Sequence, residues 1–261
     1  MLGKLLKNDL KKNLRLLLIL FGSTLAVAGL ARGINELGEN VAFFKILGII
    51  FNSIFYALAA NSIIQPFLRS FLNFTKSFYS DESYLTHTLP VPKNHLINSK
   101  FLTALIEITS GFMIVVLSLL ILFGSPTLFD TLKLLLSTLI TGEFSLFWVL
   151  FLIVALIIVE FIMYISIIYF SIVLAYRARE RRVMTAFLYT ALFAFASLSV
   201  LSVFMVVIML ANNISLTSTM LTLSNKAFFS IIVAGILVYS GISVLFYYLT
   251  KKAFRKGVNV D

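Results

Sequence analysis

Residues 146–175 read LFWVLFLIVALIIVEFIMYISIIYFSIVLA, and Glu160 is the only charged side chain among them. About 20 consecutive apolar residues, wound as a helix, match the hydrocarbon thickness of a bilayer. An amphipathic surface helix of a soluble protein would instead carry a polar stripe along one side. The stretch is therefore predicted to cross a membrane as a helix.

Five more apolar runs of comparable character flank this stretch. Hydrophobic residues make up 60% of the 261 positions and charged residues 12%, whereas a soluble domain carries about 25% charged residues. The predicted fold class is therefore all-α: a polytopic bundle of six transmembrane helices in a single domain, residues 1–261. The six spans are predicted near residues 16–30, 46–65, 101–123, 146–175, 184–211 and 227–250.

The positions of lysine and arginine predict the orientation. Segments 4–15, 69–100, 177–182 and 251–256 hold 17 of the 21 Lys and Arg residues. Because basic residues concentrate in cytoplasmic segments, both termini are expected in the cytoplasm. The net charge of +10 follows from this topology and does not indicate nucleic-acid binding.

Catalytic and metal-binding motifs were sought along the whole chain. The sequence has no cysteine, and its two histidines, His87 and His95, lack the i, i+4 spacing of helical metal ligands. Gly33 and Gly38 have the spacing of P-loop glycines, but Glu39 and Asn40 follow in place of Lys and Ser/Thr. We expect no catalytic residue, no metal site and no cofactor bound by this chain.

Residues 1–15 alternate apolar and basic side chains with helical spacing, with leucines on one face and Lys4, Lys7, Lys11 and Arg15 on the other. This pattern predicts an amphipathic helix that lies in the cytoplasmic interface beside anionic lipids. An ordinary basic anchor before the first span is the alternative.

Small residues at Gly22, Ala26, Gly29 and Gly33 form a stripe along the first predicted span. Such stripes allow two helix backbones to approach closely. We expect the stripe to pack within the chain, with a seam between two copies as the alternative.

Two carboxylates, Glu107 and Glu160, fall inside predicted spans. A charge in lipid is costly, so each side chain should face protein or water. Both are candidates for a translocation path. The alternatives are a hydrogen bond between helices and, for Glu107, a reach toward the cytoplasmic interface.

The longest predicted cytoplasmic loop, residues 66–100, is the most informative. Asp81 and Glu82 suit the start of a short helix, where carboxylates favour the positive end of the helix dipole. Pro90 and Pro92 restrict the residues before them to extended conformations. The loop is therefore expected to form a short helix and a stiff corner before the third span.

This loop reads Glu82-Ser-Tyr-Leu-Thr-His-Thr-Leu-Pro-Val-Pro-Lys93, followed by Ile97-Asn-Ser-Lys100. It resembles a stretch, roughly G-Y-L-T-x-T-L-P-V-S with a downstream S-K, that is common in type-2 ABC exporter permeases of Gram-positive bacteria. Ser83 replaces the family's glycine and Pro92 its final serine. The amphipathic start, the six spans and the internal termini also resemble that family, whose coupling helix lies in this loop.

The resemblance implies a permease without an ATPase of its own, in the cell membrane of a Gram-positive bacterium. Two copies of a separate ABC ATPase would hold ATP and Mg²⁺, and a second permease chain, identical or related, would complete a dimer. A lipophilic or amphipathic substrate, first among them a bacteriocin, toxin or signal peptide, is expected. The residues expected to contact the ATPase are Asp81, Glu82, Tyr84, Leu85, Leu89 and Lys93.

Two other functions fit the same composition. One is an ion-coupled secondary transporter or channel that uses Glu160. The other is a non-transporting membrane subunit for assembly or sensing.

Overall fold

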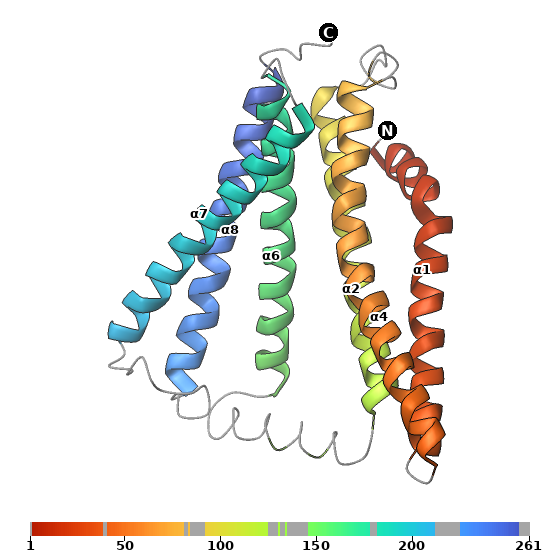
Figure 1. The fold of residues 1–261 in the computed structure, drawn as a ribbon. Helices are drawn as coiled ribbons and strands as arrows, with labels where there is room; N and C mark the ends of the chain where they lie inside the picture. The colour runs from red at the N-terminus through yellow and green to blue at the C-terminus, as the bar shows by residue number, and fades with distance from the viewer. Residues whose placement is uncertain are drawn as a thin grey trace. The chain divides into compact units, whose positions relative to one another are not determined.

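A computed structural model describes most of the chain as helix (Figure 1). No strand is present in its described residues, which are 2–38, 41–80, 83, 92–124, 130, 134, 146–177, 182–211 and 225–255. The six main helices are α1 (Leu2–Gly38), α2 (Ala42–Tyr79), α4 (Lys93–Phe123), α6 (Leu146–Ala175), α7 (Arg182–Ala211) and α8 (Asn225–Arg255).

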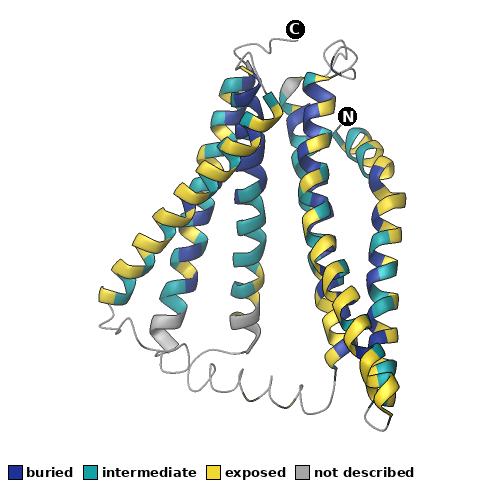
Figure 2. Ribbon diagram, viewed as in Figure 1, coloured by how far each residue is buried: buried dark blue, intermediate teal, exposed yellow. Residues whose placement is uncertain are grey.

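All six of these helices are long and apolar enough to cross a membrane. The predicted all-α polytopic architecture is thereby confirmed. The predicted ends of α6 coincide with the observed ones, and the predicted ends at Phe123 and Ala211 also hold. Large apolar side chains lie exposed along the helices, above all along α7 (Figure 2), as expected of surfaces that lipid covers.

The predicted interfacial helix at 1–15 and the predicted first span at 16–30 lie on one helix. Helix α1 runs from Leu2 to Gly38 without a break. No proline, and no glycine after Gly3, interrupts the amphipathic segment before Gly22, so its helical hydrogen bonds continue into the apolar run.

Helix α2 extends beyond the predicted end of the second span at Gln65. It continues through Pro66 to Tyr79, so residues 66–79 of the predicted loop are helical. A proline inside a helix removes one hydrogen bond, here the bond to the carbonyl of Ser62. The helix tolerates this loss because apolar residues on both sides of Pro66 keep it packed against its neighbours.

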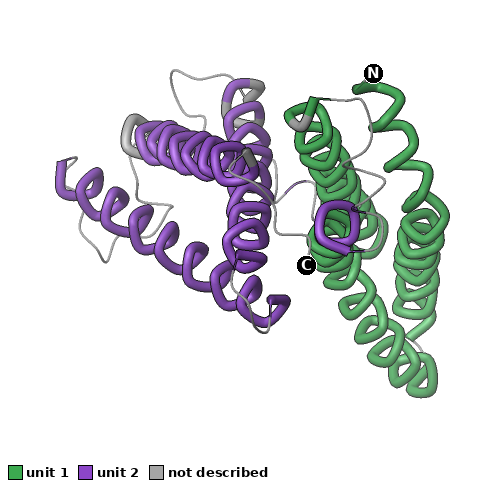
Figure 3. Tube along the Cα trace, turned by 90° about the horizontal axis from the view of Figure 1, so that it is seen from above, with its two compact units in different colours: residues 1–74, 89–129 green, residues 75–88, 130–261 purple. Residues whose placement is uncertain are grey.

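The chain forms two compact units, shown in Figure 3, where the sequence predicted one domain. Unit 1 comprises residues 1–74 and 89–129, and unit 2 comprises residues 75–88 and 130–261. The last turn of α2 therefore belongs to unit 2. Hydrophobic periodicity locates each helix but carries no information on which helices pack together.

Unit 1 is built from α1, α4 and most of α2. A hydrogen bond of 2.9 Å joins the hydroxyls of Thr24 and Ser62 between α1 and α2. Gly111 of α4 lies against the carbonyl of Ser62, where an added Cβ would overlap that oxygen. Small side chains let the helices approach this closely. The apolar core of the unit consists of Ala28, Ala31, Phe55, Ala59, Val115 and Leu122.

The expectation that the small-residue stripe packs within the chain is wrong. All four of its residues are exposed, and an added Cβ at Gly22, Gly29 or Gly33 would meet no atom within 4 Å. The buried face of α1 lies beside the stripe and is also small, with Thr24, Ala28 and Ala31. Because both faces carry small residues, spacing alone could not identify the packed one.

Unit 2 holds α6, α7 and α8 around an apolar cluster centred on Met163, Ile167 and Tyr239. Three phenylalanines, one from each helix, pack together with ring centroids 5.4–5.5 Å apart. Contacts of this kind stabilise helix packing beyond the burial of area. The three residues are Phe170, Phe193 and Phe246.

Candidate functional site

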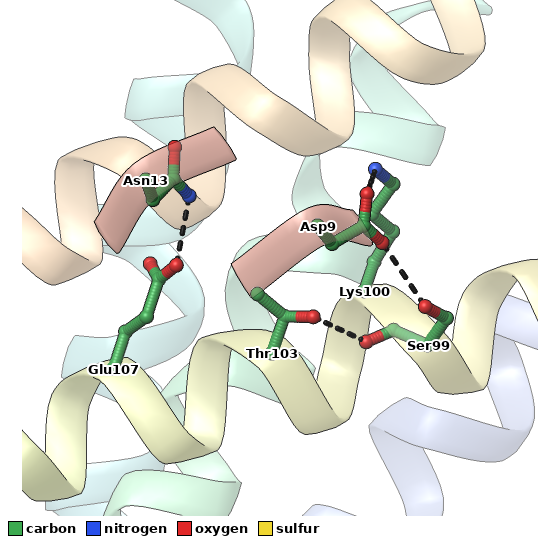
Figure 4. A network of polar contacts seen from close by, with 6 residues as sticks. All are labelled: Asp9, Asn13, Ser99, Lys100, Thr103 and Glu107. Atoms are coloured by element: carbon green, nitrogen blue, oxygen red, sulfur yellow. Dashed lines mark hydrogen bonds and ion pairs between the residues drawn. The ribbon is translucent and has the colours of Figure 1, made fainter. Parts of the chain in front are cut away.

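The candidate site flanks residues 80–92, the segment with the permease-like motif. Two groups of side chains hold the helices on either side of it. The aromatic anchor, in unit 2, consists of Phe78, Tyr79, Tyr176 and Phe254. The polar cluster, in unit 1, consists of Asp9, Asn13, Ser99, Lys100, Thr103 and Glu107 (Figure 4).

The polar cluster joins the first turns of α4 to the start of α1. The ammonium of Lys100 donates to Asp9 Oδ1 at 2.7 Å, and the hydroxyl of Ser99 donates to Asp9 Oδ2 at 3.0 Å. Both charged side chains are only 17% exposed. Thr103 donates to the backbone carbonyl of Ser99 at 2.9 Å, so its own hydroxyl is satisfied within α4. The carboxylate of Asp9 therefore has partners at both oxygens.

Glu107 lies two turns further along α4 and is almost fully buried, with 1% exposure. Asn13 Nδ2 donates to its Oε1 at 2.7 Å, while Oε2 has no hydrogen-bond partner among the described residues. The side chain thus makes the predicted hydrogen bond between helices.

The aromatic anchor fixes the end of α2 within unit 2. Tyr79 stacks on Tyr176 with ring centroids 4.2 Å apart, and Phe78 meets Phe254 edge to face at 4.9 Å. Arg177 donates to the backbone carbonyl of Ala253 at 2.6 Å. The end of α2 is therefore tied to the ends of both α6 and α8.

A cation–π contact borders the aromatic anchor. The guanidinium carbon of Arg182 lies 5.9 Å from the centre of the Tyr176 ring. Burial raises the pKa of the Tyr176 hydroxyl above its usual value, and Arg182 opposes this shift. Tyr176 is therefore a neutral phenol at physiological pH, and Arg182 faces its ring as a cation over an uncharged π system.

Glu160 lies half-buried in α6, within electrostatic range of Tyr164 on the same helix and Tyr239 on α8. Glu107 and Glu160 belong to different units and make separate contacts.

The predicted ATPase contacts Asp81, Glu82, Tyr84, Leu85 and Leu89 lie outside the described residues. Lys93 begins α4, and its side chain is outside them as well. Ser83 is described and buried, and its backbone amide donates to the carbonyl of Ser80 at 2.7 Å. The helices that hold this segment are thus defined, while the predicted contact residues remain predictions.

The sequence analysis missed Asp9, Asn13 and Ser99. A signal was present: Asp9 is the only acidic residue in a basic segment, and Asn13 follows it by one helical turn. Lys100, Thr103 and Glu107 show matching spacing on α4. Within the part of the chain that the structure describes, no three His, Cys, Asp or Glu side chains gather as metal ligands would.

These features define a multi-pass membrane protein with an all-α fold. No protein-family model, curated protein or solved structure matches the chain. Its function is therefore argued from its own residues.

Proposed function

We propose that the chain is the membrane subunit of an ATP-driven exporter, moved by a separate ABC ATPase. The observation that carries this proposal is the anchoring of segment 80–92 on both sides. Its preceding helix is held by the aromatic anchor and its following helix by the polar cluster. A connector without a mechanical role would not need a partly buried ion pair in the first turns of the helix that follows it.

The division of the chain supports the same proposal. Residues 75–88 belong to unit 2 and residues 89–129 to unit 1, so the chain passes between the units inside this segment. A force applied to the segment would reach α6 and α8 through the aromatic anchor, and α1 through Asp9 and Lys100. Rigid helices with specific contacts can carry such a force to the spans.

In the proposed mechanism, ATP and Mg²⁺ bind to two ATPase copies, and their closure pushes on the segment in each of two permease chains. The chains are identical or related, and each alternates between two arrangements whose balance the nucleotide state shifts. A route between the two chains would open alternately to either side. The six apolar spans favour a lipophilic or amphipathic cargo, such as an exported peptide.

Association with an ATPase tests the proposal. The chain and the ATPase encoded beside its gene should co-purify after co-expression. Replacing Tyr84 and Leu85 together with glutamate should reduce the co-purified ATPase at least tenfold, because apolar anchors dominate the affinity of an interface. The measurement is the amount of ATPase retained per permease, with Asn8→Glu on exposed α1 as a control that adds charge elsewhere. Undiminished association in the double variant would contradict the proposal.

Glu160 allows the ion-coupled alternative to be tested separately. Its position beside Tyr164 and Tyr239 is the feature that favours that alternative. In an ATP-driven exporter, Glu160→Gln should retain at least half of the wild-type transport rate, since Gln keeps the side chain's size and its hydrogen-bonding carbonyl. Transport measured in vesicles with and without a proton gradient checks this. A complete loss in the variant, together with dependence on the gradient, would favour ion coupling.

A further inference from the structure

A polar pocket opens where α1 ends and α2 begins, within unit 1 and apart from the candidate site. Its volume is about 420 Å³. That volume lies within the range of small-molecule sites and accommodates a polar headgroup. The lining residues are Asn35, Gly38, Lys45, Ile49 and Asn52.

The side chains of this pocket hold a defined arrangement. The amides of Asn35 and Asn52 pair reciprocally, with N···O distances of 3.1 and 3.3 Å. Gly48 allows this pairing, because a Cβ at that position would overlap Asn35 Oδ1. Each amide has two N–H groups and uses one in the pair, so each retains one further donor.

A basic residue lies among the residues that line the pocket. Lys45 lines it and forms no ion pair with any residue that the structure describes. The carboxylate of Glu36 is engaged one helical turn back by Arg32, at 3.0 Å. The pocket thus combines one cation with two amide donors, the set of groups that binds a phosphate oxygen.

Apolar side chains surround this polar site. Leu37, Phe43, Ile46 and Ile49 are all more than half exposed. Exposed apolar side chains at the end of a spanning helix are covered by acyl chains in a bilayer. A ligand with a charged head and apolar tails would therefore match both the pocket and its surroundings.

We propose that this pocket binds a phosphate group through Lys45 and the Asn35–Asn52 pair. The apolar surroundings favour the headgroup of an anionic lipid over free phosphate as its source. The site is independent of the exporter mechanism and of the segment at 80–92.

The test measures binding of two phosphate sources to the full-length protein. In the first arm, native mass spectrometry counts phosphatidylglycerol molecules retained from mixed phosphatidylglycerol and phosphatidylcholine micelles. In the second arm, inorganic phosphate competes for the retained lipid. The variants are Lys45→Gln and Asn52→Asp, which removes an amide donor and adds a negative charge at nearly constant size. Lys76→Gln, an equal change of charge at an exposed position near the end of α2, is the control.

Lys45→Gln should weaken phosphatidylglycerol retention about fivefold, because one basic residue near a bilayer surface contributes about that factor. Asn52→Asp should weaken retention at least as much, and Lys76→Gln should leave it unchanged. Competition by phosphate in the wild type would identify the phosphate group itself as the recognised element. Retention without competition would identify the intact headgroup. The proposal would be overturned if both pocket variants retained as much phosphatidylglycerol as the wild type and phosphate competed for it equally well in all three proteins.

Discussion

Replacement of Gly111 by valine is expected to lower the free energy of unfolding by about 3 kcal/mol, the upper range for overpacking a tight interior. The added Cβ would overlap the backbone carbonyl of Ser62 on α2. A backbone atom in the middle of a helix cannot rotate aside as a flexible side chain can. The two helices would have to separate, and the packing around Val115 and Phe55 would loosen with them.

Pro66 explains why this contact is so close. Proline has no N–H, so the carbonyl of Ser62, four residues earlier, loses its helical partner. Gly111 brings the backbone of α4 against this carbonyl, where Cα–H groups can partly satisfy it. A side chain at position 111 would both create the overlap and remove this compensation.

The measurement is the thermal midpoint of the detergent-solubilised protein, which should fall by roughly 6–12 °C for Gly111→Val. The thermal midpoint of Gly111→Ala should also fall, but by less. The overlap made by alanine is smaller and is partly offset by its higher helix propensity. Gly29→Ala is the matched control, since no atom lies within 4 Å of a Cβ there. The control should retain or slightly raise the midpoint. Equal midpoints for Gly111→Val and the wild type would contradict the proposed close contact.

The helices that sequence predicted best are those defined by composition alone. Residues 146–175 are nearly uncharged and are bounded by polar segments, so both ends of α6 were predicted correctly. The division of α1 near residue 15 and the end of the second span at Gln65 were placed where the sequence becomes polar, whereas both helices continue past these points. A helix can continue into a polar segment, because its backbone hydrogen bonds continue and one of its faces still packs against a neighbouring helix.

It was harder to predict from the sequence which helices pack against each other. The stripe at Gly22, Ala26, Gly29 and Gly33 and the buried face at Thr24, Ala28 and Ala31 are equally small. What distinguishes them is a partner, the hydroxyl of Ser62 on α2, and that partner is 38 residues away from Thr24. The periodicity of one helix cannot predict a contact with a residue on another helix.

The residues of the candidate site show the same difference between local and long-range features. Its motif at 82–93 was visible because it is a local string of residues. The polar cluster was not, because Asp9 and Lys100 are 91 residues apart, and each has an ordinary explanation alone. Lysines near the ends of spans are explained by the orientation of the protein in the membrane. A single aspartate in a basic segment does not by itself indicate a contact.

The Asp9–Lys100 pair yields the second large prediction. Lys100→Met should destabilise the protein by about 2–3 kcal/mol, less than the loss of a fully buried pair because both groups retain 17% exposure. The reason is that Asp9 would remain as a partly buried carboxylate, with Ser99 as its one hydrogen-bond donor among the described residues. Adding Asp9→Asn to Lys100→Met should recover most of this loss, because no unpaired charge then remains.

A double-mutant cycle in thermal unfolding measures this coupling. The control pair is Arg32 and Glu36, which are 44% and 67% exposed and lie one turn apart on α1. Glu36→Gln should change stability by less than about 0.5 kcal/mol, as is usual for exposed ion pairs. Additive effects of Asp9→Asn and Lys100→Met would show that the two charges do not depend on each other.

If the exporter proposal holds, variants of the Asp9–Lys100 pair allow the effect on stability and the effect on transport to be measured separately. The Asp9→Asn, Lys100→Met double variant should fold and should retain the ATPase, since segment 80–92 is unchanged. Its α4, however, would no longer be held to the start of α1 by an ion pair, so force from the segment would reach this part of α1 through the Asn13–Glu107 bond and side-chain packing. Substrate transport per ATP hydrolysed, measured in proteoliposomes, should therefore fall at least threefold while ATP hydrolysis persists. An unchanged ratio would mean that α1 does not take part in transmission, whatever the pair contributes to stability.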